Sequence, residues 1–164
     1  IGIMADIKKV KPNGEYRSGK YEPKNHEKYI GDIHNIIYRS SWEYRFCTYC
    51  DTNDSIIKWS SEPVSIDYYN PLDKKSHKYH VDFYMKVLKD SGESQDWIIE
   101  IKPESQTRKP IYEGTMTVAK LKSYNRNMQI WITNQAKFKA AKEWAEKRGY
   151  RFGVIDENFL FKSK

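Results

Sequence analysis

The chain has 164 residues, of which 29 are basic and 22 are acidic, giving a formal net charge of +7. This length suits one domain with a substantial hydrophobic core, and the lack of long apolar runs argues against a membrane-spanning segment or a signal peptide. The positive charge favours a polyanionic partner such as nucleic acid, although an ordinary basic protein can have the same composition.

The beginning of the chain is polar and basic. Residues 1–3, which precede Met4, are interpreted as a cloning remnant. Residues 4–29 are rich in lysine and are interrupted by two prolines and two glycines, which predicts an extended basic N-terminal arm. Such an arm could contact phosphates or a protein partner, or it could be a solvated tail. We therefore expect the folded domain to occupy residues 30–164.

A short strand and a helix are predicted next. Residues 36–39 have the apolar character of a strand, and Ser40 or Ser41 provides an N-cap for a helix from about Trp42 to Cys50. Glu43 falls in the first turn of this helix. There it either complements the helix dipole or serves as a metal-binding carboxylate.

The two cysteines of the chain, Cys47 and Cys50, have the C-x-x-C spacing of zinc and redox sites. A zinc site needs about four ligands, and the sequence has no second cysteine pair. A thioredoxin-type motif opens a helix, whereas this pair falls inside the predicted one. Two reduced thiols are therefore the preferred interpretation.

The centre of the chain predicts a β-hairpin. Two short strands at 56–60 and 64–69 and a loop over 70–78 lead into the segment 79–102, where apolar and polar residues alternate on either side of a turn. With the turn centred near Ser91, the facing apolar residues form one continuous face: Val81 with Ile101, Phe83 with Ile99, and Met85 with Trp97.

The other face of this hairpin carries charge. The same register places Asp82 opposite Glu100 and His80 opposite Lys102. Facing Cβ atoms lie about 5 Å apart, and two carboxylates at that separation repel by roughly 3 kcal/mol, a cost that a bound cation removes. The pattern predicts that Asp82 and Glu100 hold Mg²⁺, which suits carboxylate oxygens, with Lys102 beside it. The alternative is an exposed hairpin face with a cross-strand Glu–Lys pair.

The last third of the chain predicts alternating helices and strands. The expected elements are a polar loop over 103–110, a helix over 114–124, a strand over 128–132, a helix over 134–148 capped by Thr133 and ended by Gly149, and a strand over 151–155. Together with the earlier elements, this order indicates one α/β domain with a mixed central β-sheet flanked by helices.

Acidic residues in a first helix and on two strands resemble the pattern of the PD-(D/E)xK nuclease superfamily. The matching residues are Glu43, Asp82 and Glu100-Ile101-Lys102, with Val81 where the family usually has a proline. More specific segments, KYIGDIHNIIYRSSWEYRF, CDTNDSIIKWSSEPVSIDYYNP and HKYHVDFYMKV, resemble the head completion nucleases of T-even-type tailed phages. The core is also similar to the transposon end-cutting nuclease TnsA. The resemblance implies a restriction-endonuclease-like core of αβββαβ order.

The resemblance also implies an activity, namely Mg²⁺-dependent cleavage of double-stranded DNA to a 5′-phosphate and a 3′-hydroxyl, with Mn²⁺ as a substitute ion. Carried over to this sequence, Asp82, Glu100 and the backbone carbonyl of Ile101 are metal ligands. Glu43 is a third carboxylate, and Lys102 orients the attacking water or stabilises charge on the phosphate.

Further residues are candidates for supporting roles around this site. Glu62 is an alternative third carboxylate, and His80 flanks the site without requiring a role. Phosphate contacts are expected from Gln106, Arg108, Lys137 and Lys139, each of which is otherwise an ordinary surface residue.

The biological role implied by the resemblance is a late step of virion assembly. The protein would act after DNA packaging, near the DNA end at the head vertex, with portal or neck proteins as partners and no membrane. It would be found in the virion head or neck and in the host cytoplasm during assembly. The alternatives are a non-enzymatic DNA-binding or plugging component of the vertex and a free repair or restriction-type nuclease.

Overall fold

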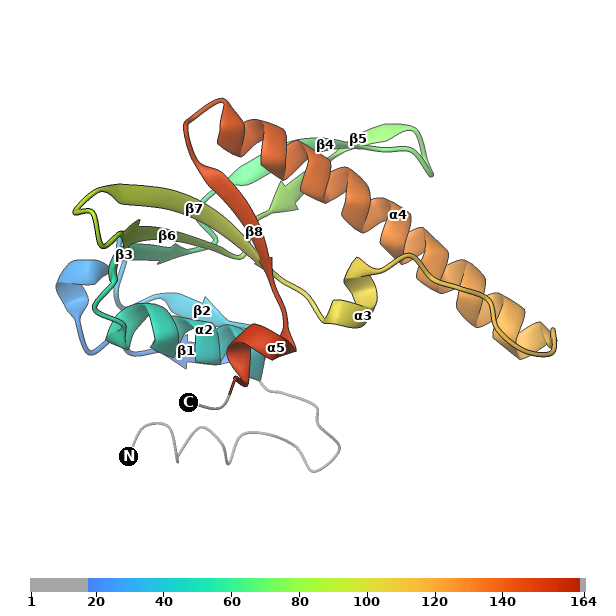
Figure 1. Cartoon of the computed structure of the whole chain (residues 1–164), viewed down its shortest axis with the longest axis horizontal. Helices are drawn as coiled ribbons and strands as arrows, with labels where there is room; N and C mark the ends of the chain where they lie inside the picture. Colours follow the sequence, from blue (N-terminus) through green and yellow to red (C-terminus); the bar gives the residue numbers. More distant parts are fainter. Residues whose placement is uncertain (1–17, 163–164) are drawn as a thin grey trace.

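A four-stranded mixed sheet lies at the centre of the computed structural model, which describes residues 18–162 (Figure 1). The elements in chain order are β1 (Gly19–Tyr21), η1 (His26–Lys28), β2 (Ile36–Tyr38), α2 (Ser41–Thr52), β3 (Ile56–Ser61), β4 (Ser65–Asn70), β5 (Lys75–His80), β6 (Phe83–Leu88), β7 (Ser94–Ile101), α3 (Glu104–Thr107), α4 (Val118–Glu146), β8 (Arg151–Ile155) and α5 (Glu157–Leu160). The central sheet has the order β3-β6-β7-β8, and β1-β2 and β4-β5 form two smaller sheets.

The predicted hairpin is the middle of the central sheet. β6 and β7 are antiparallel, with Phe83 facing Ile99 and Met85 facing Trp97 as predicted. The predicted pairs of Val81 with Ile101, Asp82 with Glu100 and His80 with Lys102 are wrong, because the pairing begins at Phe83 and His80 instead faces Ser65 on β4. β8 adds to β7 in parallel, and β3 adds to β6 in antiparallel fashion. The mixed α/β architecture predicted from the sequence is therefore confirmed.

Both faces of the central sheet are covered, each by its own hydrophobic cluster. On one face, Phe83 and Ile99 pack with α2, β1, β2 and α5, and Phe46 and Trp59 are fully buried there. On the other face, Ile98 packs against α4 and the β4-β5 hairpin. The buried part of β7 lies in its second half, at residues 98–100, so the polar Glu100 side chain is enclosed by protein. This enclosure is the setting of the candidate site.

The prediction of a loop over 70–78 is wrong for residues 75–78, because residues 75–80 form β5, which pairs with β4. The strand that was predicted to start at residue 79 is also interrupted. Asp82 lies in a bend between β5 and β6, so the chain leaves one sheet there and enters the other. As a result, Val81 does not share a face with Phe83, and instead it packs with Ile98 in the second cluster.

The predicted strand over 128–132 is wrong, because this segment lies within the 29-residue helix α4. The separate helices over 114–124 and 134–148 are therefore one element, and its N-cap is Thr117, whose side chain accepts from Lys120 N–H, rather than Thr133. A short apolar run such as MQIWI fits a buried strand or a helix turn equally well, and α4 contains no glycine or proline to end it. Figure 1 shows the second half of α4 over the sheet and the first half projecting away from it.

The expected arm over 4–29 differs from the structure in its last part, and its residues 4–17 lie outside the described residues. β1 pairs with β2, and Tyr21 is buried. Asp51 on α2 holds this segment, since its carboxylate accepts from the Tyr21 hydroxyl at 2.9 Å and from the backbone N–H groups of Lys24 and Asn25 at 2.7 and 2.9 Å. Within residues 18–162, no helix is both long enough and apolar enough to cross a bilayer.

Candidate active site

Asp82 lies at the bend between β5 and β6, and the backbone around it is fixed on both sides. Val81 N–H donates to the Val64 carbonyl at 3.3 Å, and Glu62 N–H donates to the Asp82 carbonyl at 2.8 Å. The Asp82 side chain reaches across to β7, where Oδ2 accepts from Ile101 N–H at 2.8 Å. These contacts hold the carboxylate at the C-terminal end of β7.

Glu100 on β7 is the second acidic group, and only 4% of the residue is exposed. Its Oε2 accepts from the Tyr79 hydroxyl at 2.6 Å, and its Oε1 lies 3.5 Å from the Lys102 ammonium. Burial and then the neighbouring Glu100 raise the pKa of Asp82 to about 8. The two carboxyl groups are therefore close enough that ionising both is costly, as expected for a pair that shares a proton or a cation.

Two ammonium groups stand beside this acidic pair. Lys102 follows Glu100 by two residues on β7 and lies on the same face. Lys137 on α4 has its pKa lowered by burial and by Lys102, while Glu100 and Asp82 oppose the shift. Its Nζ also lies 5.6 Å from the centre of the Tyr79 ring. The site thus combines two carboxylates with two cations.

Glu43 approaches the acidic pair from the first turn of α2, which Ser40 caps as predicted. Burial raises the pKa of Glu43, and Glu62 and Glu100 add to the effect, whereas the Arg39 N–H, which donates to Oε2, lowers it. Glu43 also contributes to the raised pKa of Asp82. The structure therefore brings Glu43 into the electrostatic surroundings of the pair, in addition to its place at the helix N-terminus.

Glu62, the alternative third carboxylate, lies beside the bend that carries Asp82. Its backbone has a φ of 47°, a left-handed conformation that is uncommon for a residue with a side chain. Its carboxylate forms an exposed ion pair with Arg39 at 2.9 Å. The side chain is therefore engaged with Arg39, whereas its N–H supports Asp82.

Several sequence candidates lie elsewhere. Gln106 and Arg108 line a pocket between α3 and α4, and Lys139 and His80 are solvent-exposed. Cys47 and Cys50 are free, buried thiols inside α2, and burial raises the pKa of both.

Tyr79 is a site residue that sequence reasoning missed. It entered the sequence prediction only as the first residue of the hairpin segment 79–102, with no role of its own. The alternation of β5 alone, with buried Tyr79 between exposed Lys78 and His80, is the signal that places its ring inward.

A Mg²⁺ ion fits the donor set of this site. Among residues 18–162, no group of three or more His, Cys, Asp or Glu side chains is already arranged around a metal position. Mg²⁺ does not require one, because it is commonly bound through one or two carboxylates together with waters and substrate phosphates. Asp82 and Glu100 supply the two carboxylates, and a cation between them would remove the cost that raises the pKa of Asp82.

This fold and this acidic pair at the end of a central strand are features of restriction-endonuclease-like nucleases. Residues 53–157 match the model of the TnsA-like endonuclease N-terminal family, and the chain belongs to this family. The predicted restriction-endonuclease-like core is thereby confirmed. The chain is also similar to the head completion nuclease of Enterobacteria phage T4, with 39% identity over 143 residues that cover 87% of this chain and 93% of that protein.

Proposed function

We propose that the chain is a Mg²⁺-dependent endonuclease that cleaves double-stranded DNA during completion of a phage head. The observation that carries the chemistry is the placement of Asp82 and Glu100 together at the end of β7 with Lys102 beside them. The family and the similarity to a head completion nuclease support the nuclease class and the assembly role.

Asp82 and Glu100 would hold the metal, with the Ile101 carbonyl and Glu43 as further ligands. When bound, Mg²⁺ polarises the scissile phosphate and makes a coordinated water a stronger nucleophile at neutral pH. Mn²⁺ is expected to substitute, because it also takes oxygen ligands.

The protein groups around the pair would orient it and balance charge. Tyr79 fixes Glu100 through the hydrogen bond to Oε2, which leaves Oε1 toward Lys102. Lys102 would orient the attacking water or neutralise charge that develops on the phosphate. Lys137 lies close enough to Lys102 and Glu100 to influence their charges, so it is the best placed of the four predicted phosphate contacts.

We place this reaction after DNA packaging, near the DNA end at the head vertex, with portal or neck proteins as neighbours. On this proposal the protein is found in the virion head or neck and, during assembly, in the host cytoplasm. The support is the similarity over 93% of a protein named for head completion.

The activity is tested by incubating supercoiled plasmid with purified protein and Mg²⁺, Mn²⁺ or EDTA. Asp82→Ala, Glu100→Ala and Lys102→Ala should abolish nicking, whereas Lys142→Ala, on the exposed face of α4, should not. Equal nicking by the wild type and the three site variants would show that the assigned site is wrong. Salt-dependent DNA binding without any nicking would favour a non-enzymatic vertex component.

A further inference from the structure

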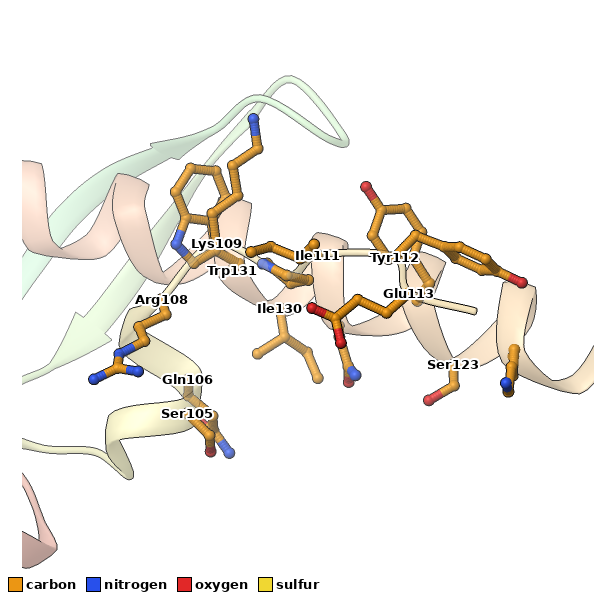
Figure 2. A pocket seen from close by; sticks show the side chains of 14 residues that line it. Ser105, Gln106, Arg108, Lys109, Ile111, Tyr112, Glu113, Ser123, Ile130 and Trp131 are labelled. Atoms are coloured by element: carbon orange, nitrogen blue, oxygen red, sulfur yellow. The ribbon is translucent and has the colours of Figure 1, made fainter. Parts of the chain in front are cut away.

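A pocket of about 730 Å³ lies outside the acidic site, between α3, the segment 108–113 and the first half of α4 (Figure 2). Its volume is within the range of pockets that bind small organic ligands. Figure 2 shows the segment from Arg108 to Glu113 running along α4, with Lys109 beside Trp131. The pocket is therefore a feature of the projecting part of the molecule.

The lining of this pocket combines cations with aromatic rings. The cationic and aromatic groups are Arg108, Lys109, Lys120, Tyr112, Tyr124 and Trp131. Glu113 is the one acidic residue among the lining side chains, and Arg108 is ion-paired with Glu104 outside the lining, so the excess of positive charge on the wall comes from Lys109 and Lys120. The combination of phosphate-binding cations and stacking rings is characteristic of surfaces that bind single-stranded nucleic acid.

Trp131 contributes its ring to this wall and is half-buried. Its indole Nε1 is buried and has no hydrogen-bond partner within residues 18–162, so the ring rather than the N–H is the part available to a ligand. The Lys109 ammonium lies 5.8 Å from the centre of the Trp131 ring, where it is placed to pair with the phosphate of a nucleotide stacked on that ring.

The pocket and the acidic site both include residues of α4. Trp131 precedes Lys137 by six residues, which corresponds to a rise of about 9 Å along the helix and places the two side chains about 120° apart around it. A strand that reaches both would therefore cross α4 obliquely, over at least the two or three nucleotides that the rise alone requires at about 3.4 Å each. α3, which forms one side of the pocket, begins directly after Lys102 and Pro103. This side of the pocket is therefore only a few residues from the end of β7.

We propose that this pocket binds one or two unpaired nucleotides next to the phosphate to be cleaved. The preferred substrate is then a DNA end with a single-stranded or frayed tail, rather than an uninterrupted duplex. Tyr112 and Tyr124 already contact each other edge to face, with ring centres 5.5 Å apart, so a base would stack on this pair or on Trp131 rather than between the rings. An unpaired base can present its face in this way, whereas a base stacked within a duplex cannot. This inference rests on the proposed nuclease function and names its substrate.

The test compares a blunt duplex with the same duplex carrying a short tail that contains 2-aminopurine, in EDTA so that no cleavage occurs. Stacking in the pocket should quench the 2-aminopurine fluorescence, and the tail should tighten binding by about tenfold. Trp131→Ala and Tyr112→Ala should each remove most of this gain, and Trp131→Tyr should retain it. Tyr69→Ala is the matched control, because Tyr69 is 59% exposed and lies on β4.

The outcomes separate this inference from the proposed function. Equal affinity of the wild type for both duplexes, or no quenching, overturns the pocket assignment even if the protein nicks plasmid. Exposed Ile111, Met116 and Val118 beside the pocket would then point to a protein partner. Quenching that depends on Trp131 supports the pocket even if Mg²⁺-dependent nicking fails. A melting curve of each variant establishes that a lost gain does not reflect unfolding.

Discussion

Replacing Asp82 with asparagine should stabilise the metal-free protein at high pH. Asparagine keeps an oxygen that can accept from Ile101 N–H, which Asp82 Oδ2 accepts at 2.8 Å. It removes the charge that burial and Glu100 make costly. Because the pKa of Asp82 is raised to about 8 from its ordinary value of 3.8, the native protein retains a proton there that the unfolded chain releases. Wild-type stability should therefore be highest below about pH 4 for this group and fall as pH rises toward about 8.

The size of this effect follows from the pKa difference. One pKa unit corresponds to about 1.4 kcal/mol, so the shift of Asp82 sets a ceiling of roughly 6 kcal/mol. Water entry and small movements of the two carboxylates reduce this cost. We therefore expect Asp82→Asn to raise the free energy of unfolding by about 2 kcal/mol at high pH. For a chain of this length, that corresponds to a melting temperature about 4–8 °C higher for Asp82→Asn than for the wild type at about pH 9.

The assay is thermal unfolding of both proteins in EDTA at about pH 5 and about pH 9. The difference in melting temperature between the variant and the wild type should be small at the lower pH and large at the higher pH. At the higher pH, Mg²⁺ should reduce this difference, because it stabilises only the wild type. Asp54→Asn, which changes an exposed carboxylate, serves as the control. A difference that is the same at both pH values would refute the assignment of Asp82 to a repulsive acidic pair.

Three further changes test the surroundings of the site and the fold. Tyr79→Phe removes the donor to Glu100 and should cost about 1–3 kcal/mol of stability and reduce cleavage, measured by urea unfolding and plasmid nicking beside Tyr69→Phe. Lys137→Ala should slow nicking by about tenfold with little change for exposed Lys139→Ala, and equal rates would remove Lys137 from the site. Asp51→Ala should lower stability by about 3 kcal/mol or more and expose residues 18–35 to limited proteolysis, because it deletes three accepted hydrogen bonds.

The central hairpin could be predicted from the sequence because its information is local. Alternation fixes which residues share a face, and a short turn fixes the register, so the pairs Phe83–Ile99 and Met85–Trp97 follow without knowledge of the rest of the chain. The predicted closeness of Asp82 and Glu100 has a different origin from the predicted strand pair, since Asp82 lies in the bend before β6 and reaches β7 through the hydrogen bond from Ile101 N–H. The first helix could be predicted for the same reason, since Ser40, one of its two predicted N-caps, begins it in the structure, and its observed end at Thr52 lies two residues beyond the predicted one.

The errors arise where tertiary context decides between local alternatives. The MQIWI segment of α4 has half-buried Met128, Trp131 and Ile132, and its local pattern fits either a strand or a helix. The residues before β2 are held by Asp51, an acid from another element that no pattern in the arm itself reveals. In both cases the deciding contact partner is distant in sequence.

The most informative difference is the break at Val81 and Asp82. A continuous strand would place Val81 on the same face as Phe83, yet Val81 packs on the opposite cluster with Ile98. The bend therefore allows the chain to bury apolar residues on both sides of the central sheet while Asp82 remains beside β7. Backbone hydrogen bonds from Glu62 and to Val64 hold the bend, and the bond from Ile101 N–H to Oδ2 holds the Asp82 carboxylate beside β7. Charge repulsion between the two acids is thus retained by the fold, and a divalent cation is the ligand that relieves it most directly.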